Sequence, residues 1–344
     1  MILTTMNILI IKTGALGDVL RTSVILEGLI EKYVHPKIYW LTSEAAKSLL
    51  ENNPFIKKLF FSEQLEEDLF DISFDLVISL EEDKSILALL ERIHAKKTFG
   101  VYLKEELVVY TPDSAPWYHM SLVSSLGKST ADELKKSNRH SYPELLYTML
   151  GLRWSFQRYR IFLNKNSLQY ARILESQIPQ DSIVIGLVVG AGSRWPMKAL
   201  PLETQIAFVR KIHSKYPAVK IILLHGLSEL ELSHAVLRDC PYVINHDIHD
   251  LNEFIGIVNL CDCIITPDTL SMHIGIALTK YVVTYFTVTS AQEIEVYTGS
   301  KLVAQHPDYC TYTKEDKQHP NITDTITADQ LFSETAKLLE RHHG

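Results

Sequence analysis

Cysteine, excess positive charge and long apolar runs are all scarce in this sequence of 344 residues. Its four cysteines, Cys240, Cys261, Cys263 and Cys310, are too few for a disulfide framework, and no second pair completes a zinc-type spacing with Cys261 and Cys263. No stretch approaches the roughly 20 apolar residues that a membrane-spanning helix requires. The N-terminus lacks the charged region and cleavage site of a signal peptide. We therefore expect a reduced, cytoplasmic protein.

The formal net charge of −7 argues against a nucleic-acid-binding protein, because such proteins have a basic balance. Hydrophobic residues make up 46% of the chain and charged residues 22%, which is typical of a soluble globular protein. The length is sufficient for two domains, each with its own core.

Short apolar runs alternate with helical patterns along most of the chain. Strands are predicted at 7–12, 37–42, 74–80 and 96–101, and again at 182–190, 219–226, 261–268 and 281–286. Helices predicted between them, such as 18–32, 202–214 and 269–278, imply parallel strands joined by right-handed crossovers. The proline-containing and polar middle, 102–160, is expected to be irregular. We predict two doubly wound α/β domains, 1–164 and 165–327, with ligands beyond the carboxyl ends of the strands in the cleft between them.

The first segment with candidate functional residues follows the first strand. The strand ends at Lys12. Gly14 and Gly17 then allow a tight turn, and Asp18 is the first residue of a predicted helix. Neither G-x-G-x-x-G nor a P-loop is present, and a carboxylate at this position would repel a pyrophosphate. Asp18 either caps the helix or acts as a general base that takes a proton from an attacking hydroxyl.

The second stretch is the segment "VVGAGSRWPMKALP", residues 188–201. Glycines after a strand are followed by Ser193, Arg194 and Lys198, which offer hydrogen-bond donors and positive charge. This composition is typical of a pyrophosphate site, and the alternative is a solvated basic turn.

The third stretch lies where a strand ends and a helix begins. Asp268, Thr269 and Ser271 precede or open this helix, and its amides together with His273 favour a phosphate ligand. A packed or capping histidine is the alternative. Between the second and third stretches, Glu229 is a candidate acceptor for ribose hydroxyls, or simply a glutamate that stabilises a helix start.

Four segments together resemble glycosyltransferase family 9, the ADP-heptose:lipopolysaccharide heptosyltransferases. They are Gly-x-x-Gly-Asp-Val-Leu at 14–20, "GAGSRWPMKALP", "TPDTLSMHIGIAL" and "YVVTYFTVTS". The resemblance runs from about residue 7 to 300. It implies a GT-B fold of two Rossmann-like domains facing a cleft, with the C-terminal helix, 328–344, packing back on the first domain.

The resemblance also implies an inverting transfer without a metal, from a nucleotide-diphospho-sugar, with ADP-heptose as the expected donor, to an acceptor hydroxyl. The acceptor would be a glycolipid of the lipopolysaccharide core or another hydroxyl compound, reached by peripheral contact with the inner membrane. A nucleotide-sugar epimerase of the same architecture and an inactive nucleotide-sugar-binding protein are the alternatives. A metal role for the acidic segment 81–83, which follows a strand, also stays open.

Roles for individual residues follow from the same resemblance. Asp18 would be the base, and Lys12, Gly14 and Gly17 become acceptor-side candidates. The donor-binding candidates are Ser193, Arg194 and Lys198 at the diphosphate, Glu229 at the ribose, and Asp268, Thr269, Ser271, Met272 and His273 at the phosphate and sugar. The sequence departs from the family pattern at Leu270 and Thr287, where the family has glycine, and at Tyr281, where it has proline.

Overall fold

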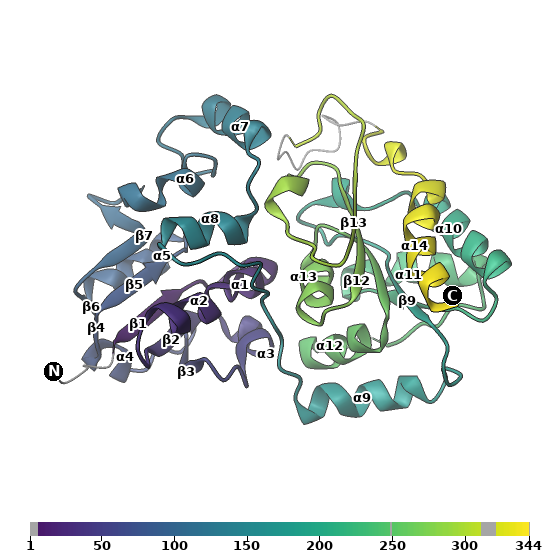
Figure 1. Cartoon of the computed structure of the whole chain (residues 1–344), viewed down its shortest axis with the longest axis horizontal. Helices are drawn as coiled ribbons and strands as arrows, with labels where there is room; N and C mark the ends of the chain where they lie inside the picture. Colours follow the sequence, from purple (N-terminus) through teal and green to yellow (C-terminus); the bar gives the residue numbers. More distant parts are fainter. Residues whose placement is uncertain (1–5, 248–249, 311–320, 344) are drawn as a thin grey trace. The chain divides into compact units, whose positions relative to one another are not determined.

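The computed structural model describes residues 6–247, 250–310 and 321–343, and it consists of two α/β units (Figure 1). The first unit runs to Phe162 and also includes Gln292–Glu295, and the second contains Leu163–Ala291 and the chain from Val296 onward. The main segment of the first unit ends at Phe162, which is two residues before the predicted division after residue 164. Residues 1–5 and 344 of the predicted domains lie outside the described part.

The first unit is built on a six-stranded sheet with the order β3-β2-β1-β5-β7-β8. The strands are β1 (Asn7–Ile11), β2 (Lys37–Thr42), β3 (Ile56–Phe61), β5 (Leu76–Ser79), β7 (Thr98–Lys104) and β8 (Leu107–Tyr110). All pairs are parallel except β7 with β8. The edge strands β3 and β8 were not predicted, because two lysines interrupt the apolar run of β3 and β8 is only four partly exposed residues within the segment expected to be irregular. A separate two-stranded sheet joins β4 (Ser73–Phe74) and β6 (His94–Ala95).

Helices of the first unit depart from the prediction in two places. The predicted helix over 18–32 is two helices, α1 (Leu16–Thr22) and α2 (Ile25–Lys32), separated at Ser23, whose hydroxyl donates to the Leu20 carbonyl at 2.7 Å. The middle segment is not irregular throughout, because it contains α6 (Ala115–Tyr118), α7 (Lys128–Ser137) and α8 (Tyr142–Met149). Helix α7 buries only Ala131, so it shows little of the apolar periodicity that identifies a helix. The remaining helices are α3 (Lys47–Leu50), α4 (Asp68–Asp71) and α5 (Lys84–Leu87).

The second unit is built on a five-stranded parallel sheet with the order β10-β9-β11-β12-β13. The strands are β9 (Val184–Val188), β10 (Lys220–Leu224), β11 (Cys263–Pro267), β12 (Tyr281–Phe286) and β13 (Gly299–Val303). The helices are α9 (Lys165–Glu175), α10 (Leu202–Lys215), α11 (Leu230–Asp239), α12 (Leu251–Leu260), α13 (Leu270–Ala277) and α14 (Ala328–His343). A parallel bridge from Ile244 to Ile222 extends the sheet beyond β10.

Helices cover both faces of the second sheet, as the unbroken burial of its central strands requires. Side chains alternate along each strand, so Leu187 and Ile265 join one core with Phe208 of α10 and Leu331 of α14. On the opposite face α13 packs closely against β11 and β12, where Gly275 leaves room for their side chains.

The C-terminal helix corrects one prediction. Helix α14 contacts α10 and strands β11, β12 and β13, and it belongs to the second unit. The prediction that it packs on the first domain is therefore wrong. Its buried side chains, Leu331 and Leu339, complete the core of the second sheet instead.

Other expectations from composition can be compared with the described residues. All four cysteines are free and buried, and Cys263 is the first residue of β11. Burial raises the pKa of the Cys261 thiol to about 12, so this thiol remains protonated. Among the helices in the described part of the chain, none has the length and apolar content needed to cross a bilayer.

Both sheets have a point at which the strand order reverses, between β1 and β5 in the first and between β9 and β11 in the second. At such a point the connections that follow the two neighbouring strands run in opposite directions. Ligands of open α/β sheets bind there, beyond the carboxyl ends of the strands. In the first unit this point lies between the segments that follow Ile11 and Ser79. In the second it lies between those that follow Val188 and Pro267.

The close packing of α9 on α12 gives a testable prediction. A Cβ atom added at Gly256 would lie 1.9 Å from the backbone carbonyl oxygen of Ser167. Because a backbone atom cannot move aside cheaply, Gly256→Ala is expected to lower the free energy of unfolding of the second unit by about 1–3 kcal/mol. Thermal unfolding measures the loss. Glu231→Ala, at an exposed position of α11, is the control, and equal stability of the two variants would contradict the packing.

Candidate active site

In the first unit, Glu81 holds the turn that follows β1. Its Oε2 accepts hydrogen bonds from the Thr13 amide at 2.9 Å, the Thr13 hydroxyl at 2.6 Å and the Gly14 amide at 3.3 Å. The Lys12 ammonium lies 3.7 Å away. Burial alone would raise the pKa of Glu81, but Lys12 and the bonds from Thr13 outweigh it and the pKa is lowered. Glu81 is therefore an ionised anchor for the turn.

The structure does not support a capping role for Asp18. Ala15 occupies the N-cap position of α1, and Asp18 lies in the first turn. The Asp18 carboxylate instead pairs with Arg21, three residues along the same helix, at 2.8 Å. Its side chain is 38% exposed, so it is oriented by this pair and still accessible to a substrate. Gly17 precedes Asp18 in the same first turn.

Arg21 is a residue that sequence reasoning missed. Its guanidinium lies 4.2 Å from the centre of the Tyr142 ring and 5.6 Å from that of Trp117. The spacing of three residues between Asp18 and Arg21 was a usable signal, because such residues are neighbours on a helix. The aromatic partners gave no such signal, since they are distant in sequence.

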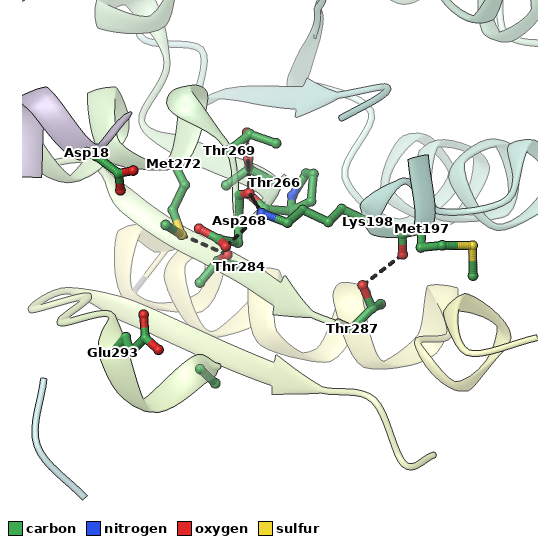
Figure 2. Close-up of polar contacts among 12 residues, drawn as sticks. Asp18, Met197, Lys198, Thr266, Asp268, Thr269, Met272, Thr284, Thr287 and Glu293 are labelled. Carbon is green, nitrogen blue, oxygen red and sulfur yellow. Dashed lines mark hydrogen bonds and ion pairs between the residues drawn. The ribbon is translucent and has the colours of Figure 1, made fainter. Parts of the chain in front are cut away.

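In the second unit, Lys198 and Asp268 form a buried ion pair (Figure 2). The Lys198 ammonium donates to the carboxylate and to the backbone carbonyl of Asp268, both at 2.8 Å. Burial alone would raise the pKa of Asp268, but Lys198, with His273 acting in the same direction, holds it well below its ordinary value. The pair joins the turn Pro196–Lys198 to the segment after β11.

The start of α13 has the features of an anion site. Thr269 is the N-cap residue, but its side chain does not cap the helix. Its hydroxyl instead shares a hydrogen bond with the Thr266 hydroxyl at 3.2 Å and donates to the Pro267 carbonyl at 3.4 Å. The first amides of the helix therefore have no side-chain acceptor from the cap residue. Helix starts of this kind favour anions.

A pocket of about 240 Å³ lies at the carboxyl ends of β9, β10 and β11. Its lining combines glycine-rich backbone, an apolar part and the start of α13. The lining residues are Val188, Gly190, Ala191, Gly192, Leu224, His225, Gly226, Ser228, Glu229, Phe254, Thr269, Leu270 and Ser271.

Glu229 ties together two loops of this pocket. Its carboxylate accepts from the Gly192 and Gly226 amides, each at 3.0 Å, and from the Ser228 hydroxyl at 2.5 Å. A Cβ atom at Gly190 would lie 2.3 Å from Cγ of Glu229, so glycine is required for this approach. The role of Glu229 in shaping the loops was not visible in the sequence.

The other donor-side candidates are dispersed. Ser193 and Arg194 are exposed on the turn after β9 and are not among the lining residues of the pocket. His273 is buried next to the ion pair, whereas Met272 is fully buried, with its sulfur accepting from the Thr284 hydroxyl (Figure 2). The structure thus brings together Lys198, Asp268 and the start of α13, and leaves Met272 in the core.

The positions that depart from the family pattern have definite places. Leu270 lines the pocket as the first residue of α13. The Thr287 hydroxyl donates to the Met197 carbonyl at 2.8 Å, which ties the end of β12 to the turn carrying Lys198. Tyr281 is buried as the first residue of β12. In the described residues no group of three or more histidine, cysteine or acidic side chains has an arrangement that could hold a metal ion.

A family model, "Glycosyltransferase family 9 (heptosyltransferase)", matches residues 218–322, which contain β10 to β13 and most of the pocket. The predicted resemblance to glycosyltransferase family 9 is confirmed over these residues, which make up less than half of the chain. By this match the chain is heptosyltransferase-like. A curated relative, lipopolysaccharide heptosyltransferase 1 of Campylobacter coli, is 22% identical over 94% of this chain and the whole of its own length.

Solved structures agree on the fold. The glycosyltransferase family 9 protein of Veillonella parvula has a TM-score of 0.76 at 18% identity, with 98% of both chains covered. ADP-heptose lipopolysaccharide heptosyltransferase II of E. coli has a TM-score of 0.69 at 16% identity, covering 98% of this chain and all of its own. E. coli heptosyltransferase WaaC with ADP-2-deoxy-2-fluoro heptose has a TM-score of 0.61 at 17% identity, with the same coverage. The chain therefore has the α/β fold of the GT-B heptosyltransferases, as predicted.

The ion pair predicts how stability depends on pH. Because the pKa of Asp268 is lowered in the folded state, its contribution is present above the unfolded value, near pH 4, and is lost as the pH falls further. Asp268→Asn is expected to destabilise the protein by about 3–5 kcal/mol at pH 7, since it leaves Lys198 buried without its counter-charge. The deficit relative to the wild type should shrink below pH 4.

Chemical denaturation at several pH values measures this deficit. Asp71→Asn, which replaces an exposed carboxylate of the first unit, is the control and should show little deficit at any pH. A deficit for Asp268→Asn that stays constant from pH 7 to pH 3 would contradict the assignment of the ion pair.

Proposed function

We propose that this protein is an inverting glycosyltransferase that transfers a heptose from ADP-heptose to an acceptor hydroxyl. One observation carries the proposal: the reversal points of the two sheets have complementary chemistry. The first has an accessible carboxylate, Asp18, oriented by a cation, and the second has a pocket with a helix start and a buried ion pair. The similar proteins include lipopolysaccharide heptosyltransferases and structures with ADP or an ADP-heptose analogue, which supports the same donor and product class.

The donor occupies the second unit, residues 165–327, in this proposal. The apolar part of the pocket, with Val188, Leu224 and Phe254, suits a nucleobase, and Glu229 is near enough to the pocket to accept from ribose hydroxyls. The diphosphate lies at the start of α13, where backbone amides and the helix dipole stabilise negative charge. The turn after β9 supplies two cations, Lys198, which contacts Asp268 directly before this helix, and Arg194, which is exposed.

The acceptor binds on the first unit, with Lys12, Gly14 and Gly17 forming part of its site. The Asp18 carboxylate takes the proton of the acceptor hydroxyl as the oxygen attacks the anomeric carbon. The bond from that carbon to the diphosphate oxygen breaks on the opposite side, so the configuration inverts. The electron pair leaves with the diphosphate, whose charge is stabilised by helix amides, Lys198 and Arg194, and the transfer proceeds without a divalent ion.

The acceptor is, in this proposal, a glycolipid of the lipopolysaccharide core or a related glycoconjugate. Such an acceptor would bring the enzyme to the inner face of the membrane as a peripheral protein. The similarity to lipopolysaccharide heptosyltransferase 1 of Campylobacter coli supports this acceptor class.

Asp18→Asn tests the base. The amide keeps the size of the side chain but cannot take a proton, so kcat is expected to fall by about 10²–10⁴-fold. Donor affinity should stay within about twofold, because the donor is bound by the second unit. Release of nucleoside diphosphate in the presence of a heptose-accepting glycolipid measures turnover. Asp71→Asn is the matched control, and turnover of Asp18→Asn at the control rate would refute the mechanism.

The donor is tested by thermal unfolding with a panel of ADP- and UDP-sugars. ADP-heptose is expected to give the largest stabilisation, about 2.7 kcal/mol at 100 times its Kd, and the shift and the turnover should both survive EDTA. Incubation with the donor alone, followed by NMR, should leave the sugar unchanged. A rearranged sugar would identify an epimerase, and binding without nucleotide release under any acceptor would identify an inactive binding protein.

A further inference from the structure

Arg21 has an environment that the proposed reaction does not yet use. Its side chain is only 14% exposed, and it lies between a carboxylate on its own helix and the aromatic rings of two other helices. One terminal nitrogen, Nη2, is 2.8 Å from Asp18. The guanidinium is thus held at a fixed place beside the proposed base.

The rings of Tyr142 and Trp117 restrict the position of the guanidinium. Tyr142 of α8 and Trp117 of α6 are in edge-to-face contact with centroids 4.6 Å apart, and both lie within cation–π distance of Arg21. The Tyr142 hydroxyl shares a 3.0 Å hydrogen bond with the Thr22 hydroxyl, which fixes the ring to α1. Burial raises the pKa of Tyr142 to about 12, so the phenol stays neutral and does not add a charge.

A second carboxylate approaches the other end of Arg21. Glu293 belongs to Gln292–Glu295, the segment that returns to the first unit. Its carboxylate lies 3.9 Å from Nη1 of Arg21 and 3.4 Å from the Lys135 ammonium of α7, and it is only 7% exposed. The Gln292 side chain donates to the Arg139 carbonyl at 2.7 Å, which secures the segment. Arg21 therefore pairs with Asp18 through Nη2 and with Glu293 through Nη1.

We propose that Arg21 is a positioning residue for Asp18 and that Glu293, by sharing the guanidinium, limits how strongly Arg21 holds the base. This inference rests on the proposed function, in which Asp18 accepts the proton. The paired guanidinium keeps the carboxylate ionised and directed, and the rings prevent Arg21 from swinging away with it. Glu293 balances the charge, so that the base is held without losing all of its proton affinity.

Other charged groups near Asp18 act through space. Glu82, directly after Glu81, interacts electrostatically with Asp18, and its pKa is raised by burial and by these two negative neighbours, which favours its neutral form. Lys12 is paired with Glu81, and Lys135 with Glu293. Arg21 therefore places a positive charge in direct contact with Asp18, and Glu293 is a second carboxylate that approaches the same guanidinium.

The test is the pH dependence of kcat/KM, which falls at low pH as a general base becomes protonated. In Arg21→Met the pH of half-maximal kcat/KM is expected to rise by about one unit, because a positive neighbour is lost. In Glu293→Gln it should move in the opposite direction, because a negative neighbour is lost and Arg21 is no longer shared. Arg21→Lys should restore the midpoint of the wild type but not its full rate, because an ammonium lacks the planar fork.

Arg92→Met, which removes an exposed arginine of the same unit, is the control and should leave the profile unchanged. Thermal unfolding of each variant, compared with that of the wild type, reports whether the first unit is folded. Folded Arg21→Met and Glu293→Gln variants with the wild-type midpoint would overturn the inference, even if their rates fall. Undiminished turnover of Asp18→Asn would instead refute the proposed function, so the two failures are distinguishable.

Discussion

The reversal of strand order in a parallel sheet is the constraint on which both candidate sites depend. At such a point the chain leaves two neighbouring strands toward opposite faces, so the carboxyl ends of these strands are not covered by their own connections. In the first unit this exposes the turn after β1 and the acidic segment after β5, and Glu81 joins them. In the second it exposes the glycine turn after β9 and the start of α13, which Lys198 and Asp268 join.

Opposite charges accompany each chemically important group because the sites are partly buried. A buried charge without a partner is costly, and removing one partner of a buried pair is strongly destabilising. The ion pairs are Asp18 with Arg21, Lys12 with Glu81, and Lys198 with Asp268. These pairs fix the geometry of the groups, and they also link the chemistry of the protein to its fold. A substrate that binds Lys198 therefore binds a cation whose charge is already balanced by Asp268.

The departures from the family pattern become understandable at this level. Thr287 replaces a glycine, and its hydroxyl holds the Met197 carbonyl in the turn that carries Lys198. Leu270 stands at the first position of α13, where the proposed diphosphate would be bound by backbone amides rather than by a side chain, so this position does not require glycine. The fold of the similar solved structures is present with these residues.

The sequence by itself determined the two α/β units and the resemblance to family 9, because buried parallel strands are continuous apolar runs and the motifs follow them. It also located Asp18, Lys198 and Asp268 at strand ends. It could not identify edge strand β8, which is only four residues long and partly exposed, or the polar helix α7, which buries only Ala131, nor the unit on which α14 packs. The tertiary structure alone decided the partners: Tyr142 is 121 positions from Arg21, and Glu293 is 272 positions away. Such contacts depend on how whole elements pack, and local sequence pattern carries no record of them.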